Sequence, residues 1–194
     1  MAAMAIDEAP VRAACEAGDW ERATTLAIEL YGSELLGYLG AILRTAEDAD
    51  DVFATVCEQL WTSLPKFRWD SSLRTYAYTL SRNAAARLAR DPHRRAKTPL
   101  SSSSVEAVVA RVRSTTAPHL RSETKDALAA VRDELDADDQ TLLILRVNRE
   151  LPWRDIAEIM CDEEVTPDAI DRRAAALRKR FERLKLELRE KLAR

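Results

Sequence analysis

Helix-forming residues run through this chain of 194 residues with few interruptions, and the residues that build tight turns are scarce. The sequence has four glycines, no Asn-Gly or Gly-Gly pair, and long tracts of Ala, Leu, Arg and Glu. Such tracts favour helices, whereas β-hairpins would need turn residues that are not present. The sequence therefore predicts an all-α protein, with enough residues for one sizeable core or two small ones.

Periodic apolar positions and capping residues divide this helical chain into segments. A break is expected near Gly32, because glycine weakens a helix interior. The Thr166-Pro167 pair predicts the start of the last helix, with threonine as its cap and proline in its first turn. Helices are predicted at residues 8–19, 20–43, 49–63, 72–90, 123–135, 138–148, 152–160 and 167–192.

Proline, serine and threonine are concentrated between residues 96 and 122, which predicts a flexible linker between two domains. The run 105–113 inside it could form one or two helical turns. The predicted organisation is a first domain at residues 1–95, a linker at 96–122 and a second domain at 123–194. The last two predicted helices have the outline of a helix-turn-helix, although any helical hairpin gives the same pattern.

Charge is distributed unevenly along the chain, although its net charge is only −3. Residues 1–65 hold 3 basic and 12 acidic side chains, a net charge of −9, and residues 66–121 hold 12 and 3, a net charge of +9. Residues 122–171 hold 5 and 15, a net charge of −10, and residues 172–194 hold 10 and 3, a net charge of +7. Solvated helices could alternate in this way by chance, but blocks this uneven are better explained by two kinds of partner: nucleic acid for the basic blocks and protein for the acidic ones.

The stretch from residue 66 to residue 95 combines aromatic and basic side chains. Phe67, Trp69, Tyr76 and Tyr78 lie among eight lysines and arginines, opposed only by two aspartates. Aromatic rings can stack on unpaired bases while guanidinium groups follow phosphates, so the mixture suits single-stranded nucleic acid. A core helix with a solvated basic face would have the same composition, and composition alone leaves the two interpretations level.

The spacing within this stretch predicts which side of its helix is buried. The helical period places Leu73, Ala77, Leu80, Ala84 and Leu88 on one face. The residues expected on the opposite, outward side are Arg74, Tyr78, Arg82 and Arg90.

Several short motifs occur along the chain in a defined order: Ala49-Asp50-Asp51-Val52, Trp61, Tyr76-Ala77-Tyr78 with Ser81-Arg82-Asn83, Leu142 with Leu145-Arg146, Leu151, and Asp155-Ile156-Ala157-Glu158-Ile159. In order and spacing, these motifs resemble those of the extracytoplasmic-function (ECF) sigma factors of bacterial RNA polymerase, from about Gly18 to Leu192. The chain departs from the family pattern at Ala54 and Thr55, and in a longer turn without glycine at residues 161–165.

The resemblance implies partners and site residues. It implies that the helix at 49–61 binds the clamp helices of the largest polymerase subunit through Asp50, Asp51, Phe53 and Glu58, although a solvated helix start explains the two aspartates equally well. It implies that the minus-ten promoter element is recognised and opened by Trp69, Ser71, Ser72, Arg74, Tyr76, Arg82, Asn83, Arg87, Arg90, Arg94 and Arg95. It implies that the minus-thirty-five element is contacted by Thr166, Asp168, Asp171, Arg172, Arg173, Arg178 and Lys179. Trp61 and Trp153 are expected in the core.

Other classes of function are disfavoured. No glycine-rich phosphate loop or cysteine–histidine nucleophile pair is present, so we expect no enzyme, and two histidines supply no metal set or cofactor site. Three widely separated cysteines, no signal peptide and no apolar run of membrane-spanning length predict a cytoplasmic protein. An anti-sigma factor would be a further partner, but the sequence identifies none. The alternative function is a sigma-like adaptor that acts through protein partners without reading a promoter.

Overall fold

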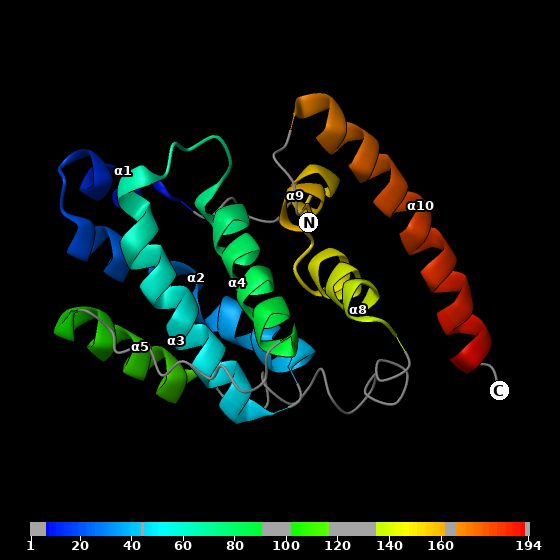
Figure 1. Cartoon of the computed structure of the whole chain (residues 1–194), viewed down its shortest axis with the longest axis horizontal. Coiled ribbons are helices and arrows are strands. Elements are labelled where there is room, and N and C mark those ends of the chain that lie inside the picture. Colours follow the sequence, from blue (N-terminus) through cyan, green and yellow to red (C-terminus); the bar gives the residue numbers. More distant parts are fainter. Residues whose placement is uncertain (1–6, 44, 91–101, 117–134, 162–165, 193–194) are drawn as a thin grey trace. The chain divides into compact units, whose positions relative to one another are not determined.

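The computed structural model describes residues 7–43, 45–90, 102–116, 135–161 and 166–192, and all regular secondary structure in these ranges is helical (Figure 1). This confirms the predicted all-α class. The chain divides into two compact units, Met1–Ser122 and Glu123–Arg194, and each is considered by itself.

The first unit is built around α2 (Trp20–Ile42), against which the other helices of the unit pack. These are α1 (Ala9–Glu16), α3 (Ala46–Ser63), α4 (Leu73–Arg90) and α5 (Ser103–Thr115), with a 3-10 turn, η1 (Leu64–Lys66), after α3. The central position of α2 explains its burial, because it contributes Tyr31, Leu35, Leu36, Tyr38 and Leu39 to the core.

Local sequence sets the helix ends. The Asp19 carboxylate caps α2 by accepting a hydrogen bond from the Arg22 amide over 3.1 Å. The Thr45 hydroxyl caps α3 by accepting from the Asp48 amide over 3.0 Å. Between α1 and α2, Gly18 has a φ of 71°, a left-handed conformation that suits glycine.

The break expected at Gly32 is wrong, because α2 continues through this residue. A Cβ atom at this position would lie 3.1 and 3.2 Å from the two methyl carbons of Val112 in α5. Glycine is therefore used here for the close approach of two helices rather than for a bend.

The expected linker is also corrected over part of its length. Residues 103–115 form the continuous helix α5, whose valines 105, 108, 109 and 112 are buried against the first unit. Valines at this spacing line one face of a helix, and that face is covered by α2. The flanking residues 96–101 and 117–122 lie outside the described part of the chain.

The second unit contains α8 (Ala137–Leu143), which continues as the π-helical turn η2 (Ile144–Asn148), then α9 (Trp153–Ile159) and α10 (Pro167–Leu192). The α10 helix packs on α8 and α9 and buries Ile170, Ala174, Leu177, Phe181 and Leu184. Its range agrees with the prediction, whereas the helix expected at 123–135 lies outside the described residues except for Leu135.

Candidate nucleic-acid interface

The first turn of α4 presents three backbone amides that have acceptors outside the helix. The Thr75 amide donates to the Ser72 hydroxyl over 3.0 Å. The Leu73 and Arg74 amides each donate to the Glu8 carboxylate over 3.0 Å, although Glu8 precedes them by 65 and 66 residues. The start of α4 is therefore held both by its own cap and by a residue that immediately precedes α1.

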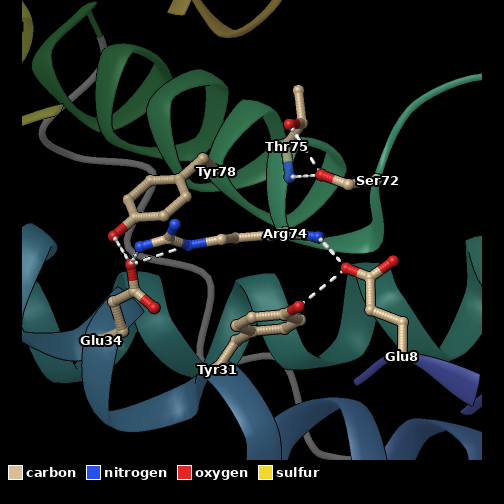
Figure 2. Close-up of polar contacts among 7 residues, drawn as sticks. All are labelled: Glu8, Tyr31, Glu34, Ser72, Arg74, Thr75 and Tyr78. Atoms are coloured by element: carbon tan, nitrogen blue, oxygen red, sulfur yellow. Dashed lines mark hydrogen bonds and ion pairs between the residues drawn. The ribbon is translucent and has the colours of Figure 1, made fainter. Parts of the chain in front are cut away.

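Arg74 belongs to a polar network between α4 and α2 (Figure 2). Its Nε donates to Glu34 of α2 over 3.0 Å, and the Tyr78 hydroxyl donates to the same Glu34 oxygen over 2.9 Å. Burial lowers the pKa of Arg74, but the hydrogen bond and ion pair with Glu34 outweigh it and raise the pKa above its ordinary value. Arg74 is thereby held as a cation inside the first unit.

The outward placement of Arg74 and Tyr78 is therefore wrong. Tyr78 is fully buried, and its ring packs edge-on against Tyr38 at 5.2 Å between centroids. The side of α4 that carries Arg74 and Tyr78 packs against α2. The exposed face of α4 therefore differs from the face that the spacing of leucine and alanine predicts. Leu80 and Leu88, expected in the core, are only half-buried.

The aromatic side chains around the start of α4 form a continuous row. Phe67 stacks on Tyr76 with 4.6 Å between ring centroids and 23° between ring planes. Trp69 lies against the same Phe67 at 5.0 Å, and the guanidinium of Arg12 lies 4.5 Å from the centre of the Trp69 ring. The three rings are half-buried, so they keep surface that a flat ligand could reach.

A polar stripe continues from this row along α4. Tyr76, Asn83, Arg87 and Arg90 follow one another at intervals of seven, four and three residues, which places them on one side of the helix. Arg87 and Arg90 are exposed and Asn83 is half-buried. The row and the stripe together offer stacking faces next to cationic groups, the combination that binds single-stranded nucleic acid.

Of the remaining predicted minus-ten residues, the structure describes Ser71, Ser72 and Arg82, whereas Arg94 and Arg95 lie outside the described residues. Ser71 is half-buried and Ser72 is exposed, although the Ser72 hydroxyl is already used to cap α4. Arg82 is half-buried on α4. Arg94 and Arg95 follow the last described residue of α4.

On α3, the predicted polymerase-binding residues separate into different environments. Phe53 is fully buried, so its predicted contact with the polymerase is wrong: it is a core residue. Asp51 and Glu58 are half-buried and lie seven residues apart, on one side of the helix. Asp50 lies on another side, where its carboxylate is 4.0 Å from Nε of Arg113 in α5.

In the second unit, Thr166 caps α10 as predicted, with the Ala169 amide donating to its hydroxyl over 3.3 Å. Arg172 is exposed, and its Nε donates to the Asp168 carbonyl over 3.3 Å. Asp168, Arg178 and Lys179 are also exposed. These five residues extend over several turns of one helix, so the structure does not bring them together at one point.

Two other predicted residues of α10 have partners inside the second unit. A guanidinium N–H of Arg173 donates to the Met160 carbonyl at the end of α9. Asp171 forms an exposed ion pair with Arg154 of α9 over 3.3 Å. Trp153, half-buried rather than fully in the core, packs against Phe181 at 5.6 Å and lies under the guanidinium of Arg146.

Sequence reasoning did not identify Glu8, Arg12 or Glu34, which contact the predicted site residues most directly. The contacts of Glu8 and Glu34 with α4 span 40 to 66 residues, so they cannot be predicted from local sequence spacing. The only signal in the sequence is that Glu8 and Arg12 lie four residues apart, which places both on one side of a helix.

Two further observations concern the described residues alone. Within them, no group of three or more histidine, cysteine or carboxylate side chains is placed to hold a metal ion. None of the described helices combines the length and the apolar character needed to cross a membrane.

One family model matches the part of the chain that contains this surface. Residues 27–95 match the family model of sigma-70 region 2, a range that begins within α2 and includes α3 and α4. No curated protein and no solved structure matches the chain. The match therefore supports a sigma-70 family member and, in general terms, a role as an RNA polymerase sigma factor, with residues 27–95 as its region 2.

Proposed function

We propose that the chain is an alternative sigma factor of the ECF type, which directs bacterial RNA polymerase to specific promoters in the cytoplasm. It is not an enzyme; it supplies binding surfaces for core polymerase and for promoter DNA. An anti-sigma factor is a further partner that this proposal allows but does not require.

The observation that carries the proposal is that two findings fall on the same residues. The sigma-70 region 2 match covers residues 27–95, and the aromatic row and the polar stripe of α4 lie within the same range. Opening a duplex takes bases out of their stack, and aromatic faces beside guanidinium groups can compensate for the lost stacking.

The proposal divides the work among the helices. Asp51 and Glu58 of α3 contact the clamp helices of the largest polymerase subunit. Trp69 and Tyr76, with Arg87 and Arg90 of α4, capture the opened minus-ten element. Arg172 and the exposed residues around it on α10 contact the minus-thirty-five element as duplex.

The test is to bind the purified chain to bacterial core polymerase and to select promoters from a random library by transcription. We expect a stable complex and a selected set that shares two conserved blocks upstream of the start. A chain that does not bind core polymerase, or that yields no preferred sequence, contradicts the proposal.

Two contacts favour a sigma-like adaptor as the second candidate. In the free protein, Arg12 lies over the Trp69 ring, and Asp171 on α10 is paired with Arg154. In this second candidate, both contacts would keep these side chains engaged within the protein instead of with DNA. An adaptor would bind polymerase in the same assay but would open no promoter, so one experiment separates the two functions.

A further inference from the structure

The N-terminal end of α1 contacts both Trp69 and the start of α4, which follows the loop that carries Trp69. Glu8 immediately precedes α1 and reaches the start of α4 through its carboxylate (Figure 2). Arg12, four residues later, reaches the Trp69 ring at 4.5 Å. Because residues four apart share one side of a helix, a single helical face contacts the loop at residues 67–72 through Trp69 and the start of α4 that follows this loop.

Glu8 accepts three hydrogen bonds, two from the start of α4 and one from Tyr31 of α2. One carboxylate oxygen accepts from the Leu73 amide, and the other accepts from the Arg74 amide and from the Tyr31 hydroxyl, at 2.7 Å. The first amides of a helix lack partners within the helix and carry the positive end of its dipole, so a carboxylate is well suited to this place. Burial and the hydrogen bond to Glu8 raise the pKa of Tyr31, which keeps its hydroxyl protonated as a donor.

Arg12 holds a residue whose backbone is in an uncommon conformation. Trp69 has a φ of 60°, in the left-handed region that bulky side chains rarely adopt. Such a conformation persists only where the surroundings hold it. Here Arg12 lies over the ring by a cation–π contact, and Phe67 packs against the ring at 5.0 Å.

We propose that Glu8 and Arg12 are positioning residues for promoter opening: they hold the loop between Phe67 and Ser72 so that the Trp69–Phe67–Tyr76 row is ordered before DNA arrives. This inference rests on the proposed sigma-factor function. Neither residue needs to touch DNA, and both lie outside the range that matches sigma-70 region 2.

The test compares Glu8→Gln and Arg12→Ala with the wild type as complete holoenzymes on a promoter that the wild type selects from the library. Permanganate reactivity of thymines measures strand opening, and footprinting measures upstream duplex binding. We expect opening to fall about tenfold in each variant, from the loss of a helix-capping contact in Glu8→Gln and of a cation–π contact in Arg12→Ala, while duplex binding is retained. Arg12→Lys keeps a cation over the ring and should recover most of the opening.

Controls separate positioning from a general loss of fold. Glu16→Gln and Arg22→Ala remove exposed charges of the same sign from α1 and α2, and should leave opening at the wild-type level. Circular dichroism is used to choose an assay temperature at which every variant is folded. In a background with Trp20, Trp61 and Trp153 replaced by phenylalanine, the emission of Trp69 should change on Arg12→Ala.

The possible outcomes are distinct. Unchanged or increased opening in Glu8→Gln and Arg12→Ala, with a wild type that opens the promoter, overturns the inference and leaves the sigma-factor function intact. Increased opening in Arg12→Ala alone also overturns the inference, because Arg12 would then block the Trp69 ring instead of positioning it. A wild-type holoenzyme that opens no promoter overturns both the inference and the proposed function.

Discussion

Arg74 of α4 and Glu34 of α2 form an ion pair in the interior of the first unit, with side chains only 23% and 15% exposed. The pair joins the helix that carries the predicted DNA-binding residues to the central helix of its unit. Arg74 is also one of the residues that were predicted to contact the minus-ten element.

Arg74→Met should destabilise the protein by about 3 kcal/mol, because the Glu34 carboxylate would remain largely buried without its cation. The double variant Arg74→Met with Glu34→Leu should lose less than the sum of the two single losses. Denaturant unfolding measures each value. Arg111→Met is the matched control, since its ion pair with Glu29 is exposed and should contribute less than about 1 kcal/mol.

A fragment that ends at residue 95 should fold poorly, whereas a fragment that ends at residue 122 should fold. The shorter fragment lacks the four buried valines of α5, each of which contributes about 1.5 kcal/mol or more when buried. That loss is comparable to the whole stability of a small domain. Far-UV circular dichroism and thermal melting compare the fragments, and equal melting temperatures would show that α5 is not part of the core.

Gly32→Ala should destabilise the first unit, although alanine is normally favoured over glycine in a helix by about 1 kcal/mol. The added Cβ would meet the Val112 methyl carbons at 3.1 and 3.2 Å. In a Val112→Ala background the same substitution should become neutral or stabilising. Thermal unfolding of the four proteins gives the coupling, and an additive result would mean that the two residues do not crowd each other.

Glu158→Gln should raise stability at neutral pH. Burial, and repulsion from Asp155, raise the pKa of Glu158 above its ordinary value of 4.5. A carboxyl group whose pKa is higher in the folded than in the unfolded protein lowers the stability of the fold once pH rises above its folded-state pKa. Below its unfolded-state pKa the group is protonated in both states, and the loss of stability is absent. The melting temperature of the variant should therefore exceed that of the wild type at pH 7, and the difference should disappear as pH falls below about 4.5. The matched control is Glu187→Gln, which removes an exposed carboxylate of α10 and should leave the melting temperature at pH 7 close to that of the wild type.

Trp69→Ala combined with Tyr76→Ala should leave polymerase binding intact and strongly reduce strand opening. Each captured base gains roughly 1–3 kcal/mol by stacking on an aromatic ring, so the loss of two rings removes much of the compensation for unstacking. The matched control is Trp69→Phe with Tyr76→Phe, which keeps a stacking face at both positions. Permanganate reactivity distinguishes the two, and normal opening by the alanine variant would assign the aromatic row to packing alone.

The sequence by itself determined the all-α class and the extent of most helices. The prediction at 167–192 agrees with α10, including its Thr166 cap, and the prediction at 20–43 agrees with α2 to within one residue. These features depend on contacts between residues at most four apart, so the sequence pattern reports them directly. The aromatic and basic composition around α4 was also evident, because it requires no knowledge of packing.

Only the tertiary structure decided which side of α4 is exposed and which residues are available to a partner. Tyr78 and Phe53 became core residues, α5 joined the first unit, and Glu8 capped a helix that starts 65 residues later. Each of these outcomes depends on which helix packs against which. A helix with polar residues on several sides has more than one face that could be buried, and its neighbours, distant in sequence, select one of them.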